Sequence, residues 1–225
     1  MNVKQRMTPD PITATPKMSH RQAVQTMQDN NIRRLPVVDD RGRLVGIVSE
    51  RDLLSTAPSQ ATTLSIYEIY TLLDKLTLDK IMSSPVLAVD EDCGLANAAH
   101  IMYQNKIGCL PVVRGDQLIG IITETDIFGT LVEVLGGGEP GLRVDLRALD
   151  EKGVLVGVAQ AVAGAGGNIV SLTTFHGEDA LHGILSLKVR GAQEDVLRDS
   201  LEALPEVDIV DFRPSKTDGD TRSFG

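Results

Sequence analysis

The fold of this chain is decided by a stretch that occurs twice, as Gly46-Ile47-Val48-Ser49-Glu50-Arg51-Asp52 and as Gly120-Ile121-Ile122-Thr123-Glu124-Thr125-Asp126. Both copies place a hydroxyl residue after an apolar run and an aspartate three positions later. The apolar run predicts a strand, and the hydroxyl predicts the start of a helix. The chain therefore contains the same strand-to-helix turn twice.

Two further blocks recur in the same order before this stretch. Met7-Thr8-Pro9-Asp10-Pro11-Ile12 matches Met82-Ser83-Ser84-Pro85-Val86, and Leu35-Pro36-Val37-Val38 matches Leu110-Pro111-Val112-Val113. Solenoid repeats are shorter and more numerous than this. Two long copies predict a pair of domains related by a pseudo-two-fold axis.

Each repeat predicts the element order β-α-β-β-α. Short strands are expected at residues 12–15 and 86–89, after the Met/Pro blocks. The next helix has a capping box of Ser19 and Gln22 in the first repeat, and Asp92 as its cap in the second. After the Pro-Val-Val strands and the strands that follow them, a second helix begins near Ser49 and Thr123.

The rest of the chain divides at changes of composition. Residues 64–76 have apolar side chains at helical spacing, and the Gly/Pro-rich segment 136–141 interrupts any helix. Segment 142–213 predicts the order β-α-β-β-α-β, which is ferredoxin-like, so the fold class is α+β. The predicted divisions are a first domain (1–54), a linker with an inserted helix (55–76), a second domain (77–135), a Gly/Pro linker (136–141), a third domain (142–213) and a disordered tail (214–225).

The repeated turn carries the chemistry. A hydroxyl at a helix start, as at Ser49 and Thr123, can cap the helix or donate to a phosphate. Asp52 and Asp126 lie one turn further on and can accept two hydrogen bonds from a ribose diol. The alternative is that the hydroxyls only cap and the aspartates only favour the helix dipole. The recurrence of the pattern in matched positions favours ligand binding.

These blocks resemble those of tandem cystathionine-β-synthase (CBS) domains, over residues 1–134. The resemblance implies a module that binds AMP, ADP, ATP or S-adenosylmethionine as a regulatory ligand, with no other cofactor. It implies that Asp52 and Asp126 hold ribose, that Ser49 and Thr123 contact phosphate, and that the segments at Ile12 and Val86 line the adenine pocket. Arg51 adds phosphate charge in the first site, where the second site has Thr125.

The third domain resembles an ACT domain in the motifs Asp150-Glu151-Lys152-Gly153-Val154-Leu155 and Gly166-Gly167-Asn168-Ile169. The resemblance implies an amino acid bound between subunits through Asp150, Gly153 and Asn168, or dimerisation alone. Lys152 stands where the family has proline before the glycine, so the turn departs from the family's pattern at this position. The whole arrangement resembles acetoin-utilisation B-type proteins, which implies a link to acetoin metabolism.

Composition excludes several classes of function. The chain has 225 residues, with 22 basic against 31 acidic side chains, a net charge of −9, 3% aromatic residues and no tryptophan. An acidic, aromatic-poor surface argues against nucleic acid and against anionic membranes as partners. No signal sequence or spanning segment is evident, so a cytoplasmic location is expected.

No catalytic or metal-binding pattern is evident either. The four histidines are scattered, and Cys93 and Cys109 lack a CxxC spacing. Cys109 is expected in the core. The predicted function is a non-catalytic ligand sensor that acts as a homodimer on an unidentified protein. The alternative is a scaffold that dimerises while its ligand sites stay vestigial.

Overall fold

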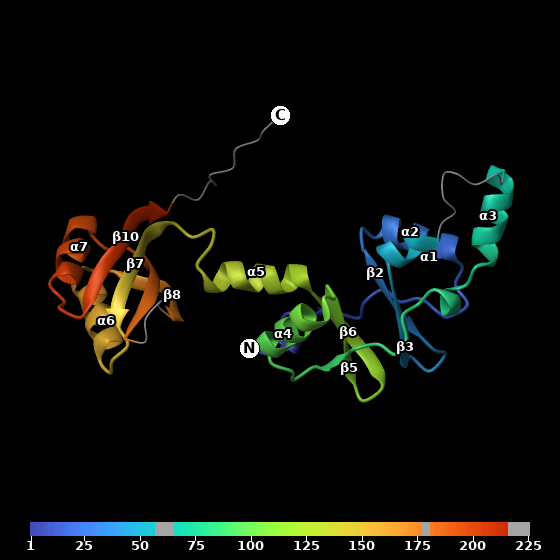
Figure 1. The fold of residues 1–225 in the computed structure, drawn as a ribbon, viewed down its shortest axis with the longest axis horizontal. Helices are drawn as coiled ribbons and strands as arrows, with labels where there is room; N and C mark the ends of the chain where they lie inside the picture. Colours follow the sequence, from blue (N-terminus) through green and yellow to red (C-terminus); the bar gives the residue numbers. More distant parts are fainter. Residues whose placement is uncertain (57–64, 177–180, 216–225) are drawn as a thin grey trace. The chain divides into compact units, whose positions relative to one another are not determined.

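The computed structural model describes residues 1–56, 65–176 and 181–215, and of Ile66 and Ser215 only the backbone. It consists of two compact units, Met1–Ile127 and Phe128–Gly225 (Figure 1). The division between them falls within one helix, α5 (Glu124–Val134). The domain divisions proposed from the sequence stay predictions.

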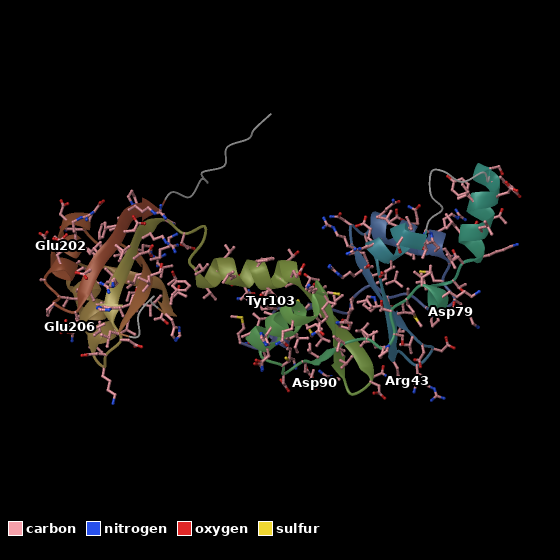
Figure 2. The ribbon with its side chains drawn as sticks, viewed as in Figure 1. Arg43, Asp79, Asp90, Tyr103, Glu202 and Glu206 are labelled. Carbon is pink, nitrogen blue, oxygen red and sulfur yellow. The ribbon has the colours of Figure 1, made fainter. Side chains whose placement is uncertain are left out.

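The first unit contains both repeats as far as Ile127 of α5, with the predicted order of helices and strands after the leading segments. The first repeat consists of α1 (His20–Asp29), β2 (Arg34–Val38), β3 (Leu44–Ser49) and α2 (Glu50–Thr56). The second consists of β4 (Val89–Asp90), α4 (Leu95–Asn105), β5 (Cys109–Arg114), β6 (Gln117–Thr123) and α5. At the turn between β2 and β3, Arg43, which is labelled in Figure 2, forms an ion pair of 2.6 Å with Asp39.

The segment that leads into each repeat packs on the other repeat. The first leading segment contains a 3-10 helix, η1 (Val3–Gln5), and strand β1 (Thr8–Pro9), which pairs antiparallel with β6 and gives the sheet order β1-β6-β5-β4. The second contains η2 (Leu78–Lys80), and its Ser83 bridges Ile47 of β3. A side chain on Gly46 would overlap Sδ of Met82, and one on Gly120 would overlap Sδ of Met7. Glycine is therefore required at both positions, because each methionine side chain lies directly against the glycine of the other repeat.

This exchange also explains where the predicted leading strands are wrong. Residues 12–15 form only one isolated bridge, from Ala14 to Val37, because the preceding Asp10 pairs with Ile119 of β6 instead. The predicted strand at 86–89 begins only at Val89. The chain crosses from one sheet to the other in these segments and cannot pair along its whole length with either.

Helix capping differs between the repeats. The Ser19–Gln22 capping box of α1 is confirmed, with hydrogen bonds of 3.3 and 3.0 Å. The cap predicted at Asp92 is wrong, because the N-cap of α4 is Gly94, which makes no side-chain hydrogen bond. The backbone carbonyl of Met1 accepts from Leu95 N at 3.1 Å and so satisfies a first-turn N–H group.

Each repeat has its own hydrophobic core, completed by the exchanged segments. Val3 of η1 is buried in the core of the second repeat, and Leu78 of η2 is buried in that of the first. The first core contains Ala14, Ala23, Met27, Leu35, Val37, Val48, Leu53 and Leu78. The second contains Val3, Val89, Leu95, Ala98, Met102, Leu110, Val112 and Ile122.

The helix predicted between the repeats is present as α3 (Ile66–Lys75), capped by Ser65 and Glu68. It packs on α1, and Arg21 Nε lies 2.5 Å from the carboxylate of Asp74. Residues 57–64, which include part of the predicted linker, lie outside the described residues.

The second unit has the predicted ferredoxin-like topology. Its elements are β7 (Gly141–Leu149), α6 (Val154–Gly164), β8 (Asn168–His176), β9 (His182–Arg190), α7 (Glu194–Glu202) and β10 (Val207–Ser215). The sheet is antiparallel in the order β10-β7-β9-β8, and both helices pack on one face through residues such as Val158 and Leu197 (Figure 1). Strand β10 continues to Ser215, beyond the expected boundary at 213, because Pro214 and Ser215 still pair with β7. The rest of the predicted tail lies outside the described residues.

The sheet face opposite the helices carries a polar network. Arg143 donates to Ser186 Oγ at 3.0 Å, and Ser186 donates to Asp145 at 2.5 Å. Lys188 is 4% exposed, and its Nζ donates to the carbonyl of Gly136 at 2.6 Å. This bond holds the turn after α5 against the sheet.

Candidate functional site

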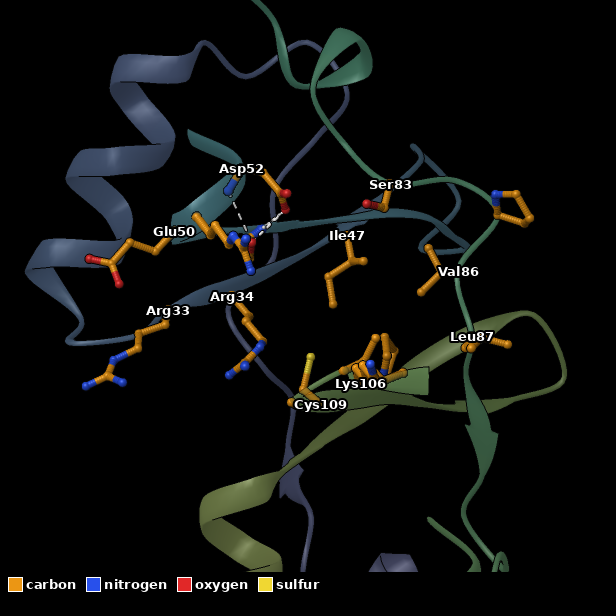
Figure 3. Close-up of a pocket in the computed structure, with 16 residues that line it drawn as sticks. Arg33, Arg34, Ile47, Glu50, Asp52, Ser83, Val86, Leu87, Lys106 and Cys109 are labelled. Atoms are coloured by element: carbon orange, nitrogen blue, oxygen red, sulfur yellow. Dashed lines mark hydrogen bonds between the residues drawn. The ribbon is translucent and has the colours of Figure 1, made fainter. Parts of the chain in front are cut away.

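The first unit contains a cavity of about 480 Å³ between the two repeats (Figure 3). One wall is the end of β3 and the start of α2, from Ile47 to Asp52. The opposite wall is the leading segment of the second repeat, from Ser83 to Leu87, together with the turn between α4 and β5, from Lys106 to Cys109. Volumes of 300–1,000 Å³ are typical of small-molecule sites.

The exchange of leading segments brings some predicted site residues together. Ser49, Arg51 and Asp52 of the first repeat line the cavity with Val86 of the second. Ser49, Asp52 and Val86 are half-buried, whereas Arg51 is exposed. The predicted group therefore consists of a helix start from one repeat and a leading segment from the other.

Ser49 and Asp52 form a reciprocal cap at the start of α2. The backbone N–H and the hydroxyl of Ser49 donate to Oδ2 of Asp52 at 2.8 and 2.7 Å, and the backbone N–H of Asp52 donates to Ser49 Oγ at 3.2 Å. This is the capping role that the sequence left open as the alternative. Both bonds to the Asp52 carboxylate are accepted by Oδ2, so Oδ1 takes no part in the cap.

The second copy of the motif repeats this geometry. Thr123 donates to Oδ2 of Asp126 at 2.8 Å from its backbone and 2.7 Å from its hydroxyl, and Asp126 N donates back at 3.3 Å. Neither residue lines the 480 Å³ cavity, nor does Ile12, which is 40% exposed. The leading segment that carries Ile12 runs beside β6, since Asp10 N donates to Ile119 O at 3.2 Å.

Several lining residues were missed by sequence reasoning. Arg34 begins β2 and Arg33 directly precedes it, and Lys106 and Cys109 flank the turn before β5. The sequence signal for these residues was their position just before the two Leu-Pro-Val-Val blocks. This position puts both turns next to the repeated motif only once the two repeats pack together.

Cys109 is 6% exposed, as its predicted core position requires. Burial raises the pKa of its thiol to about 11, while Arg34 lowers that pKa and Glu124 raises it. A thiol with this pKa is protonated at neutral pH, so Cys109 contributes an apolar surface to the cavity and no nucleophile.

The residues proposed for an amino-acid ligand lie at opposite ends of the C-terminal sheet. Gly153 caps α6 with φ +101°, a left-handed conformation that favours glycine. Asp150 N donates to Leu181 O beyond the end of β7, whereas Asn168 pairs with Arg190 at the opposite end of β9. Nine-residue strands separate these ends by roughly 25 Å. One chain therefore cannot bring Asp150, Gly153 and Asn168 to one ligand, and only a second chain can complete such a site.

Among the described residues, no three or more His, Cys, Asp or Glu side chains are grouped closely enough to hold a metal ion. Within the same part of the chain, no helix is both long and apolar enough to cross a membrane.

Comparison with known proteins accounts for the duplicated unit. The CBS domain model matches residues 3–58 and 78–133. A CBS domain-containing protein of Dictyostelium discoideum is 32% identical over 137 residues, which are 59% of this chain and 92% of that protein. This chain belongs to the CBS domain family. Its tandem CBS pair, followed by a ferredoxin-like unit, confirms the predicted fold class.

A solved structure agrees with this assignment. A Vibrio cholerae protein named for acetoin utilization (AcuB) is 34% identical, with a TM-score of 0.51 over 60% of this chain and 93% of its own. CBSX2, solved in complex with AMP, is 29% identical, with a TM-score of 0.49 over 59% of this chain and 97% of its own. The AMP is bound to CBSX2 in that structure. The chain spans 32% and 44% of two longer relatives from Methanocaldococcus jannaschii, MJ1404 and MJ1225, to which it is 36% and 38% identical over 58% and 54% of its own length.

Proposed function

We propose that this protein is a non-catalytic regulator whose CBS pair binds an adenosyl ligand, which is AMP, ADP, ATP or S-adenosylmethionine. One observation carries the proposal: a single cavity joins Ser49 and Asp52 of one repeat to Val86 of the other. A ligand in this cavity contacts both repeats at once. It therefore favours the arrangement of the repeats that best fits it, which is what a sensor requires.

The lining suits the parts of such a ligand. Ile47, Val86 and Leu87 form the apolar side of the cavity, where an adenine ring fits (Figure 3). Oδ1 of Asp52 is the acceptor for the ribose diol. The hydroxyl of Ser49 and the guanidinium of Arg51 lie on the same wall and serve the phosphate. We assign Ile12, Thr123 and Asp126 the same roles in a second, independent site.

The test is calorimetric titration of AMP, ADP, ATP and S-adenosylmethionine into the wild-type protein and two matched variants. Asp52→Ala and Asp126→Ala each remove one equivalent cap, so their folding costs are comparable. At a ligand concentration of 100 Kd, binding adds about 2.7 kcal/mol of stability, which raises Tm by several degrees at this size. Only Asp52→Ala is expected to remove binding to the cavity. A stoichiometry and affinity in Asp52→Ala that match the wild-type protein would contradict the assignment.

For the C-terminal unit we propose an ACT domain that pairs two chains, with Asp150 and Gly153 of one chain and Asn168 of the other holding an amino acid. The protein is then a cytoplasmic homodimer that regulates a partner protein, with a link to acetoin metabolism. Light scattering measures the dimer. A thermal-shift panel of amino acids tests the site, and an Asn168→Ala variant that still dimerises is expected to lose any shift.

A second candidate function is a dimerising scaffold. The reciprocal bonds of the two caps favour it, because Ser49 and Asp52 already satisfy each other without a ligand. A dimer that shows no thermal shift with any adenosyl compound, in protein free of bound ligand as purified, would support this candidate over the sensor.

A further inference from the structure

We propose that Lys106 makes this cavity selective for phosphorylated adenosyl ligands over uncharged or cationic ones such as adenosine and S-adenosylmethionine. The inference rests on the proposed function and names the ligand class of the same site. It follows from the charge of the lining and from the backbone conformation of Lys106.

The cavity is lined by more basic than acidic side chains, although the protein as a whole is acidic. Its lining includes Arg33, Arg34, Arg51 and Lys106 against Glu50 and Asp52, although the chain has 31 acidic and 22 basic residues. Arg33 and Glu50 extend away from the centre of the cavity, whereas Arg34 and Lys106 lie near Cys109 (Figure 3).

Within the described residues, these cations form no ion pairs of the kind that other cations in the same unit form. Arg21, Arg43 and Arg114 each form an ion pair with a carboxylate. Among the residues that the structure describes, no salt bridge involves Arg33, Arg34, Arg51 or Lys106. Basic side chains without an ion pair around one cavity favour an anionic ligand, because the ligand supplies the negative charge that no described carboxylate supplies to them.

Lys106 also adopts a backbone conformation that its side chain does not favour. It ends α4 with φ 53° and ψ 40°, in the left-handed region. At this position helices prefer glycine, or asparagine as the next choice. The first repeat has the favoured residue, since Asn31 has φ 51° at the equivalent place before Ile32.

The two turns are otherwise alike. Ile32 N donates to Met27 O at 2.9 Å in the first repeat, and Ile107 N donates to Met102 O at 3.1 Å in the second. The backbone therefore gives no reason for a lysine at 106. The ligand gives a reason for the lysine. Its flexible ammonium group has three hydrogen-bond donors and can therefore bind phosphates of different number and position in the cavity.

The experiment compares Lys106→Asn and Lys106→Arg with the wild-type protein, using adenosine, AMP, ATP and S-adenosylmethionine as titrants. Lys106→Asn is expected to weaken ATP binding about tenfold or more, and to change adenosine and S-adenosylmethionine binding less than twofold. Its ligand-free Tm is expected to rise by a few degrees, since asparagine relieves the left-handed position. Lys106→Arg is expected to keep most of the ATP affinity.

A double variant, Asn31→Lys with Lys106→Asn, keeps the net charge and serves as the control. It is expected to lose ATP affinity at this cavity like the single variant. Recovery of that affinity would show that total charge decides binding and would overturn the proposal. So would equal weakening of all four titrants by Lys106→Asn, or a wild-type preference for S-adenosylmethionine over ATP. If the wild-type protein binds none of the four, the proposed function itself fails, which is a distinct result.

Discussion

The two CBS repeats are alike where their backbone needs particular residues and differ where side chains line the cavity. Their caps agree within 0.1 Å in all three hydrogen bonds. In both, a methionine of the other repeat also packs against a glycine. At two other matched positions, however, the residue types differ. Arg51 of the first repeat is equivalent to Thr125 of the second, and Lys106 of the second is equivalent to Asn31 of the first. The comparison shows that the duplicated unit preserves its folding contacts and that charge distinguishes its two halves.

The largest expected effect tests whether the two cores are energetically equivalent. Leu35 and Leu110 occupy matched, fully buried positions in separate cores. Leu35→Ala and Leu110→Ala are each expected to lower the free energy of unfolding by about 2–5 kcal/mol, measured by urea denaturation. Leu54→Ala, at a side chain 69% exposed, is the control and should change it little. A loss in only one repeat would break the equivalence.

The next effect tests the exchanged leading segments. Gly46→Ala and Gly120→Ala place a methyl group where a methionine side chain lies, so each is expected to cost about 1–3 kcal/mol. Gly46→Ala should cost more, because its new Cβ also lies 3.2 Å from Cβ of Met82, which cannot swing aside. Adding Met82→Ala should recover part of the loss in Gly46→Ala and none in Gly120→Ala. Equal recovery in both would argue against the exchange.

A smaller effect measures the caps. Ser49→Ala and Thr123→Ala are each expected to cost about 1 kcal/mol in thermal or urea unfolding, because each removes the reciprocal bonds at a helix start. Asp52→Ala combined with Ser49→Ala should cost less than the sum of the single variants, since both break one cap. Strictly additive losses would show that the two residues act separately.

The smallest effect concerns a carboxylate found in the second repeat alone. Arg114 and Lys4 hold the pKa of Glu91 at about 2, through bonds of 2.6 Å from each. A lowered folded-state pKa stabilises the protein above the ordinary value near 4.5, and this stabilisation is lost as the pH falls toward 2. Glu91→Gln should flatten the pH dependence of Tm between pH 5 and 2. An unchanged profile would show that the Lys4 and Arg114 contacts are not maintained in solution.

Local rules were sufficient for most elements of this fold. The capping box at Ser19, the amphipathic α3 and the alternating strands of the C-terminal unit all follow from the spacing of apolar and capping residues within a few turns. The duplication itself was visible as three blocks in register. These signals depend on neighbours in sequence, so they are readable without coordinates.

Contacts between distant residues were decided by the tertiary structure alone. Met1 O replaces Asp92 as the partner of the α4 start, and the leading segments exchange between the sheets, because backbone groups take whichever partner packing brings within reach. The packing of the repeats also brings Val86 to Asp52 and places Lys106 at the cavity, whereas the strand register of the C-terminal sheet separates Asp150 from Asn168. The sequence by itself determined the two matched helix starts and their chemistry, whereas only the packing of the repeats decided which side chains share a site.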